Sequence, residues 1–186
     1  VSSTSPADTS TSLSSTSSIS VTFSEPMDNS TLSTNTSNTS CSGSIQVSSD
    51  NFSTCVQMTS APTTNDSNLT FAVTPTSNLS NLTTYKIRVS TGAKDLVGYA
   101  LNSLYTSTTG FKTKSIPTNI FNGKNRTCAL LSDGKVKCWG LGTYGQLGNG
   151  LNTSSSTPVE VGDIINATTI IMGRDHTCAL ISDGTI

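Results

Sequence analysis

The chain has few charged and few aromatic residues. Of its 186 residues, 11% are charged and 5% are aromatic, whereas an ordinary soluble domain has about 25% charged residues. Lys and Arg number 10 and Asp and Glu number 11, and no basic stripe is present that could neutralise a phosphate backbone. Nucleic acid is therefore not an expected partner.

Long apolar runs are absent as well. No stretch approaches the roughly 18 apolar residues that a membrane-spanning helix needs, and the N-terminal VSSTSPADTS lacks the basic and apolar regions of an export signal. The chain begins at Val1 rather than Met, which favours an excerpt from a longer protein. Ser and Thr fill about a third of the sequence, so solubility depends on hydroxyl groups.

One sequence motif occurs twice. TCALLSDGKVKCWG begins at Thr127, and TCALISDGTI begins at Thr177, so the spacing is 177 − 127 = 50 residues. A fixed period of this size is typical of solenoids and propellers, in which each unit buries its apolar face against a neighbour. Within this motif, Ser-Asp-Gly separates two strand-like stretches, which predicts a β-hairpin loop.

The hairpin predicts how two of the five cysteines pair. If Ser132–Gly134 forms the loop, residues whose numbers sum to 266 lie opposite each other, so Cys128 faces Cys138. Directly opposed residues have Cβ atoms about 4.5 to 5.5 Å apart, close enough for a disulfide after small adjustment. The same arithmetic gives Cys178 a partner at position 188, two positions after Ile186, and we expect Cys178 to be free in this chain.

Several residues recur in phase within the repeated region. They are Gly-x-x-x-Thr-Cys-Ala-Leu, Asp-Gly-x-Val-x-Cys-Trp-Gly and the stretch Gly145–Gly150. From about residue 116 to 186 the pattern resembles the regulator of chromosome condensation repeat, in the form common in secreted bacterial proteins. The resemblance implies four-stranded blades of a β-propeller, with one complete repeat and the start of a second here. Arg126 departs from the family, which usually has the His found at His176, and Gly142 replaces a usual Asn.

Residues 1–112 alternate between apolar and polar side chains, as half-buried strands do. Ile19, Val21 and Phe23 would share one inner face, and Tyr85 follows a stretch that suits a tyrosine corner. The spacing of the segments predicts a β-sandwich. The expected strands are Ser18–Phe23, Ile45–Val47, Cys55–Met58, Leu69–Val73 and Tyr85–Val89.

The same region resembles a second family. A resemblance to the bacterial Ig-like domain of surface-layer and large secreted proteins is carried by Ser5–Asp8, Ile19–Asp28 and Lys94–Gly98, although Tyr99 replaces a usual Asn. Cys41 and Cys55 lie within this domain and are expected to form a disulfide. Closing a loop of about 15 residues contributes roughly 3 kcal/mol in the chain-entropy model.

The expected fold class is all-β. An Ig-like β-sandwich at residues 1–112 is followed by a linker at 113–118, and residues 119–186 form the first blade or so of a β-propeller. This organisation rests on the strand pattern, the 50-residue period and the two resemblances.

Metal binding and a catalytic carboxylate pair fit the sequence less well than structural roles do. Cys128, Cys138 and His176 lack the short paired spacing of zinc ligands, so no metal site is expected there. Asp133 and Asp183 each precede Gly at the same repeat position, which favours turns over a catalytic pair.

Three further groups have side chains of a type that contacts ligands. Glu25 and Asp28 supply only two evident oxygen ligands, too few for calcium. Trp139 is expected to pack between blades. Tyr144, in the glycine-rich stretch Gly142–Gly150, is the candidate surface contact.

These features predict a non-enzymatic protein. The single His, His176, lies beside a repeat strand, and no Ser-His-Asp arrangement can be argued from it. The leading hypothesis is a segment of a bacterial protein at the cell surface or outside the cell, in which an Ig-like spacer presents a propeller to a protein or glycan partner; no cofactor is expected. The alternative is an accessory region of an exported hydrolase whose catalytic domain lies outside this chain.

Overall fold

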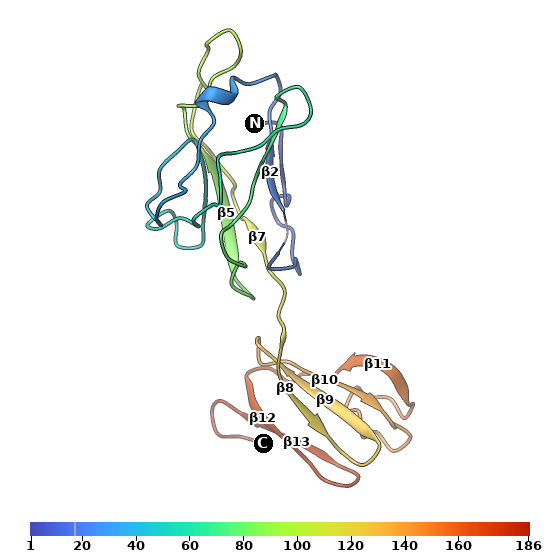
Figure 1. Cartoon of the computed structure of the whole chain (residues 1–186). Helices are drawn as coiled ribbons and strands as arrows, with labels where there is room; N and C mark the ends of the chain where they lie inside the picture. Colours follow the sequence, from blue (N-terminus) through green and yellow to red (C-terminus); the bar gives the residue numbers. More distant parts are fainter. Residues whose placement is uncertain (17) are drawn as a thin grey trace. The chain divides into compact units, whose positions relative to one another are not determined.

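The computed structural model describes residues 1–16 and 18–186 and divides the chain into two units, Val1–Lys114 and Ser115–Ile186 (Figure 1). The residues expected to form a linker are shared between the units. Thr113 is 1% exposed within the first unit, where its hydroxyl donates a hydrogen bond to the Ser80 carbonyl at 2.7 Å. Pro117 begins the first strand of the second unit.

The first unit contains two antiparallel sheets. One has the strand order β1-β2-β4 and the other β3-β5-β6, with β7 pairing β5. The elements are β1 (Ser3–Ser5), β2 (Ile19–Thr22), the 3-10 helix η1 (Asn29–Thr31), β3 (Ile45–Ser48), β4 (Thr70–Val73), β5 (Thr84–Val89), β6 (Tyr105–Thr106) and β7 (Phe111–Lys112).

The core of the first unit is formed by alternate residues of these strands. Ile19 and Val21 are fully buried and Phe23 is 3% exposed, so the inner face expected from the alternation is confirmed. The Phe23 ring packs edge-on against Phe71 with centroids 6.0 Å apart. The sandwich therefore closes over a single apolar cluster.

The predicted tyrosine corner is present. The hydroxyl oxygen of Tyr85 accepts a hydrogen bond from the Ser80 backbone N–H at 2.9 Å, and the Tyr85 ring stacks on Phe111 at 5.8 Å. The side chain thus fixes the loop before β5 at its polar end while its ring fills the core.

The expected strand at Cys55–Met58 is wrong as a continuous strand. The N–H of Val56 bonds the Val47 carbonyl at 2.8 Å, whereas that of Thr59 bonds the Thr74 carbonyl at 2.8 Å. The segment therefore passes from the sheet of β3 to the sheet of β4, and only Met58 forms a bridge, with Pro75. Alternating side chains can be buried along such a crossing without ladder pairing.

The second unit is built from consecutive antiparallel strands. A four-stranded sheet has the order β11-β10-β9-β8, and a separate pair follows. The strands are β8 (Pro117–Asn122), β9 (Arg126–Leu131), β10 (Val136–Gly140), β11 (Ser155–Glu160), β12 (Ala167–Met172) and β13 (Thr177–Ile181).

The repeat period is visible in the strands. Strand β12 begins at Ala167 and β8 at Pro117, a difference of 50 residues. In the β9–β10 hairpin, Cys128 lies opposite Cys138 and Thr127 opposite Trp139, which is the register with a sum of 266. The turn chemistry of Ser-Asp-Gly thus sets the register of this hairpin.

Candidate functional site

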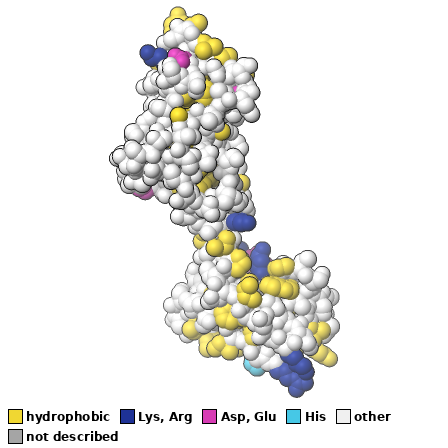
Figure 2. Space-filling model, in the orientation of Figure 1, with side chains coloured by type: hydrophobic (Ala, Val, Ile, Leu, Met, Phe, Trp, Pro, Cys, Tyr) yellow, Lys and Arg dark blue, Asp and Glu magenta, His cyan; other side chains and the backbone are white. Residues whose placement is uncertain are grey.

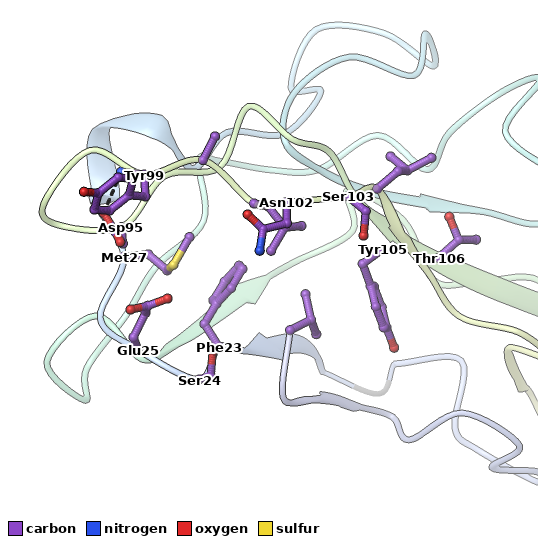
Figure 3. Close-up of a pocket in the computed structure, with 14 residues that line it drawn as sticks. Phe23, Ser24, Glu25, Met27, Asp95, Tyr99, Asn102, Ser103, Tyr105 and Thr106 are labelled. Carbon is purple, nitrogen blue, oxygen red and sulfur yellow. Dashed lines mark hydrogen bonds between the residues drawn. The ribbon is translucent and has the colours of Figure 1, made fainter.

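A groove of about 700 Å³ lies at one end of the first unit (Figure 3). One wall is the segment Phe23–Met27, which follows β2, and the other is Tyr99–Thr106, which leads into β6. Val1 contributes to the lining. Figure 3 shows the Phe23 and Glu25 side chains across the groove from Asn102, with Tyr99 at one end. We call this the end groove.

A tight turn shapes one end of the end groove. The Asp95 carboxylate accepts hydrogen bonds from the N–H groups of Val97 at 2.9 Å and Tyr99 at 2.8 Å. Gly98 has a φ of 94°, a conformation that residues with a Cβ rarely adopt. The turn leaves Leu96, Val97 and Tyr99 between 63% and 78% exposed. Tyr99, which departs from the family pattern, is thus held by its own backbone N–H.

The end groove carries acidic and apolar groups. Its ionisable side chains are the carboxylates of Glu25 and Asp95 and the phenols of Tyr99 and Tyr105, and Val1 brings the α-amino group of this chain to the same lining. Lys, Arg and His side chains are absent from the described lining. Phe23, Met27 and Leu101 belong to or pack on the apolar core. Figure 2 shows that apolar side chains gather at the uppermost end of the first unit, on a face that is otherwise mostly uncharged.

The Asp28 carboxylate is engaged by the residues that follow it. Asp28 accepts hydrogen bonds from the Ser30 hydroxyl at 2.7 Å and the Ser30 N–H at 2.9 Å, and these bonds lower the pKa of its carboxyl. Asp28 therefore caps helix η1. Across residues 1–16 and 18–186, no group of three or more His, Cys, Asp or Glu side chains could hold a metal ion.

Each unit contains one disulfide. Cys41 is bonded to Cys55 in the first unit, and Cys128 to Cys138 in the second. Cys128 and Cys138 are at most 1% exposed, and their Cα atoms are 4.1 Å apart in the directly opposed register. Cys178 has a free and exposed thiol. The four bonded cysteines cannot serve as metal ligands.

Arg126 joins the first repeat to the second. Its side chain is 5% exposed and donates hydrogen bonds to the carbonyls of Gly173, Arg174 and His176 and to the Thr177 hydroxyl. All four acceptors lie in or beside the turn between β12 and β13. The guanidinium suits this task because its donors form a rigid planar fork. The sequence identified Arg126 only as a departure from the family pattern.

Tyr144 lies at a small pocket of about 260 Å³ in the second unit, which we call the Tyr144 pocket. Tyr144 is 85% exposed, whereas Leu147 in the same loop is fully buried. The Tyr144 N–H donates to the Gln146 side chain at 2.8 Å, and Gly145 N–H bonds the Gly142 carbonyl at 3.0 Å. The loop is therefore fixed while its aromatic ring remains accessible.

The second repeat contributes polar groups to the Tyr144 pocket. Asp175, His176 and Thr177 line it together with Ile170 of β12. From the sequence, His176 is expected neither as a metal ligand nor as part of a catalytic triad. In the structure it lines the same pocket as Tyr144, because the turn between β12 and β13 contributes Asp175 and His176 to that lining.

The paired aspartates form turns, as expected. Asp133 accepts the Lys135 N–H at 3.2 Å, and Asp183 accepts the Thr185 N–H at 3.0 Å. The glycines that follow them, Gly134 and Gly184, have φ values of 74° and 89°. Each carboxylate thus closes its own turn.

Comparisons with known proteins agree with this architecture. Residues 1–113 match the bacterial Ig-like domain, and residues 133–180 match the regulator of chromosome condensation repeat. Among curated proteins, none matches the chain significantly. In the described part of the chain, no helix is long and apolar enough to cross a membrane.

Two solved structures similar to the chain are of surface-layer proteins. The S-layer protein rSbsC(31-844) aligns with a TM-score of 0.41 and 21% identity over 68% of this chain and 18% of its own. The N-terminal part of the bacterial S-layer protein SbsC aligns with a TM-score of 0.42 and 17% identity, over 92% of this chain and 36% of its own. The family matches, together with the sandwich and the 50-residue repeat, show that the chain belongs to the bacterial Ig-like domain family and continues into a regulator of chromosome condensation repeat.

Proposed function

We propose that the chain is a non-enzymatic binding segment of a secreted or surface bacterial protein. In this proposal the first unit is a spacer, and the repeats contact a protein or glycan at the cell surface through the loop that carries Tyr144. The two family matches support a binding or structural role. The disulfide in each unit supports an oxidising, extracellular location.

The exposed ring of Tyr144 on a fixed loop is the observation that carries the binding role. Tyr provides a large amphipathic contact area at a low cost in side-chain entropy. Burying a ring that is 85% exposed gains apolar contact, and the loop needs no reordering because Leu147 and Gln146 already hold it. Asp175 and His176 at the same pocket supply polar groups for orienting a ligand.

The test uses the full chain with a glycan array and with purified bacterial cell-wall sacculi. We expect saturable binding that Tyr144→Ala weakens at least tenfold, as for an aromatic contact at the centre of an interface, and that Tyr144→Phe largely keeps. Tyr99→Ala is the matched control, because this ring is also highly exposed but belongs to the first unit. Unchanged binding by Tyr144→Ala, or release of reducing sugar from sacculi, would contradict the proposal.

A further inference from the structure

The Tyr144 pocket contains a nearly buried amide with an unused donor. Gln146 lines the pocket and is 6% exposed. Its side-chain oxygen accepts the Tyr144 N–H at 2.8 Å, which fixes the orientation of the amide and turns its nitrogen the other way. Among residues 1–16 and 18–186, this nitrogen has no hydrogen-bond partner, although a primary amide has two N–H groups to donate. An enclosed donor of this kind is stabilised by a ligand oxygen that enters the pocket.

The wall around this amide is apolar. Leu147 is fully buried and Ile170 is 3% exposed, and both line the pocket. Val161 and Ile164 complete the wall and pack against the same core cluster. The volume of about 260 Å³ is below the roughly 300 to 1,000 Å³ of pockets that enclose a whole small-molecule ligand. The pocket therefore suits one small group of a larger ligand, with a methyl group for the wall and a carbonyl oxygen for Gln146.

The rim of the Tyr144 pocket is aromatic and polar. Tyr144 is 85% exposed and offers a ring face against which the C–H groups of a sugar can pack. Asp175 and His176, also in the lining, exchange hydrogen bonds with hydroxyl groups. Arg174 Nε lies 3.6 Å from an Asp175 carboxylate oxygen, so this carboxylate already has a cation beside it. The rim thus favours a neutral ring with several hydroxyl groups.

The turn that supplies these polar groups is held in position. Arg126 donates hydrogen bonds to the carbonyls of Gly173, Arg174 and His176. The imidazole of His176 lies against Gly173, where a Cβ would overlap the ring. The loop on the other side of the pocket is fixed through the Tyr144 N–H. Both sides are therefore ordered before a ligand arrives, which reduces the entropy lost on binding.

We propose that the Tyr144 pocket binds an N-acetylated amino-sugar residue of a glycan. This inference rests on the function proposed above and names the class of ligand. Gln146 Nε2 donates to the acetamido carbonyl oxygen, while the acetamido methyl group contacts Leu147 and Ile170. The sugar ring packs on Tyr144, and a ring hydroxyl donates to the Asp175 carboxylate. A sugar with a hydroxyl in place of the acetamido group leaves the apolar wall uncovered.

The first test titrates the full chain with tri-N-acetylchitotriose and with cellotriose, followed by NMR. The two trisaccharides share rings and linkage, but cellotriose has a hydroxyl in place of each acetamido group. We expect saturable shifts of the Gln146 side-chain amide and the Tyr144 N–H, with cellotriose bound at least tenfold more weakly because it fills neither the wall nor the donor. Equal affinity for both sugars, or no saturable binding of the N-acetylated one, would overturn the proposal.

The second test changes the donor. Gln146→Glu keeps an acceptor for the Tyr144 N–H but replaces Nε2 by a carboxylate oxygen, and should weaken binding of tri-N-acetylchitotriose at least fivefold, about the value of one net hydrogen bond. Acidification should restore part of this loss relative to the unchanged chain, because a protonated carboxyl donates again. Asn149→Asp adds the same charge to the same loop outside the pocket lining and should bind normally. Unchanged affinity in Gln146→Glu would refute the role of the amide.

Purified sacculi separate this inference from the function on which it rests. Binding that requires Tyr144 but shows no preference for N-acetylated sugars would overturn the inference and leave the proposed function standing. Loss of all Tyr144-dependent binding would remove both. Wall fragments released from the sacculi, compared with tri-N-acetylchitotriose, distinguish a cell-wall glycan from a chitin-type glycan as the source of the sugar.

Discussion

The two units of the chain differ in how completely they bury the apolar residues of their strands. The first unit covers its core on both faces with two sheets, and its central strand residues Ile19, Val47 and Val89 are fully buried. In the second unit, Ile170 of β12 is 3% exposed, whereas Ile120, at the same repeat position 50 residues earlier in β8, is 62% exposed. An isoleucine at the same repeat position is therefore buried in the second repeat and exposed to solvent in the first.

This difference shows that a repeat depends on its neighbour to bury the apolar side chains of its first strand. Ile170 belongs to the cluster that includes Leu130 and Val136 of the first repeat, so one repeat covers the leading strand of the next. Ile120 has no preceding repeat in this chain, and Ile171 is 67% exposed on β12. A sandwich is complete by itself, whereas a repeat is completed by contacts along the array.

Separate expression of the two units should give the largest difference. Residues 1–114 contain a closed core and a disulfide, so we expect a cooperative thermal transition with the strand signal retained. Residues 115–186 have an incomplete core and should show a broad transition or none. Circular dichroism and calorimetry of the two segments measure this contrast. A sharp thermal transition of residues 115–186 expressed by themselves would contradict this predicted difference.

Removing the disulfides should have the next largest effect. Replacing Cys41 and Cys55 by Ser opens a loop in the first unit and should lower its free energy of unfolding by roughly 3 kcal/mol in the chain-entropy model. The first unit should remain folded because its core does not depend on the bridge. The pair Cys128 and Cys138 is embedded in the core of the second unit, and its replacement by Ser should abolish protection of β9 and β10 amides. Hydrogen exchange of the full chain checks both outcomes. If both units kept their amide protection equally well after loss of the disulfide, the predicted difference between the units would be wrong.

Arg126 offers a smaller and more local change. Arg126→Ala removes the donors to the β12–β13 turn and should cost about 2 kcal/mol, which corresponds to roughly thirtyfold faster exchange of β13 amides if local opening controls exchange. Arg126→Lys should restore only part of the protection, because an ammonium cannot match the fork. Lys124→Ala, at an exposed position nearby, is the control. Unchanged exchange in Arg126→Ala would show that the hairpin is held by its apolar contacts alone.

Acidification should affect the first unit more than the second. In the first unit the Thr54 hydroxyl and N–H, together with Ser48, lower the pKa of Asp50 to about 2, and the pKa of Asp66 is lowered by Thr70. A folded pKa below the unfolded value stabilises the fold above the unfolded pKa, and this stability is lost as the pH falls toward 2. Asp50→Asn should flatten this loss between pH 4 and pH 2, as followed by urea unfolding. An identical pH profile in the variant would contradict this role of Asp50.

The sequence predicts those features that depend on local chemistry or on the period. The β9–β10 register follows from the Ser-Asp-Gly turn, and the buried face of β2 follows from the alternation of Ile19, Val21 and Phe23. The contact of Tyr85 with the loop before β5 follows from the residues that precede it. In each case neighbouring residues determine the geometry, so a single sequence is sufficient.

The end groove could not be predicted in this way. Strand β1 is Ser-Thr-Ser, with no apolar alternation, and β6 has only two residues, so both depend on tertiary pairing. The groove forms because Phe23–Met27 and Tyr99–Thr106, which are far apart in the sequence, meet at one end of the sandwich. For Arg126, the sequence showed an unusual residue type but not its acceptors, which are backbone carbonyls of the next repeat.

Light scattering of the full chain over a range of concentrations tests most directly the claim that the second unit leaves apolar strand faces open. We expect an apparent mass that rises above the 19.3 kDa of one chain as concentration increases, because exposed apolar patches promote association. The double variant Ile120→Ser and Ile171→Ser should lower the mass toward that of the monomer, whereas Leu96→Ser in the first unit should not. A chain that stays monomeric throughout, with a second unit that resists protease, would show that these repeats form a self-sufficient fold and would contradict the account.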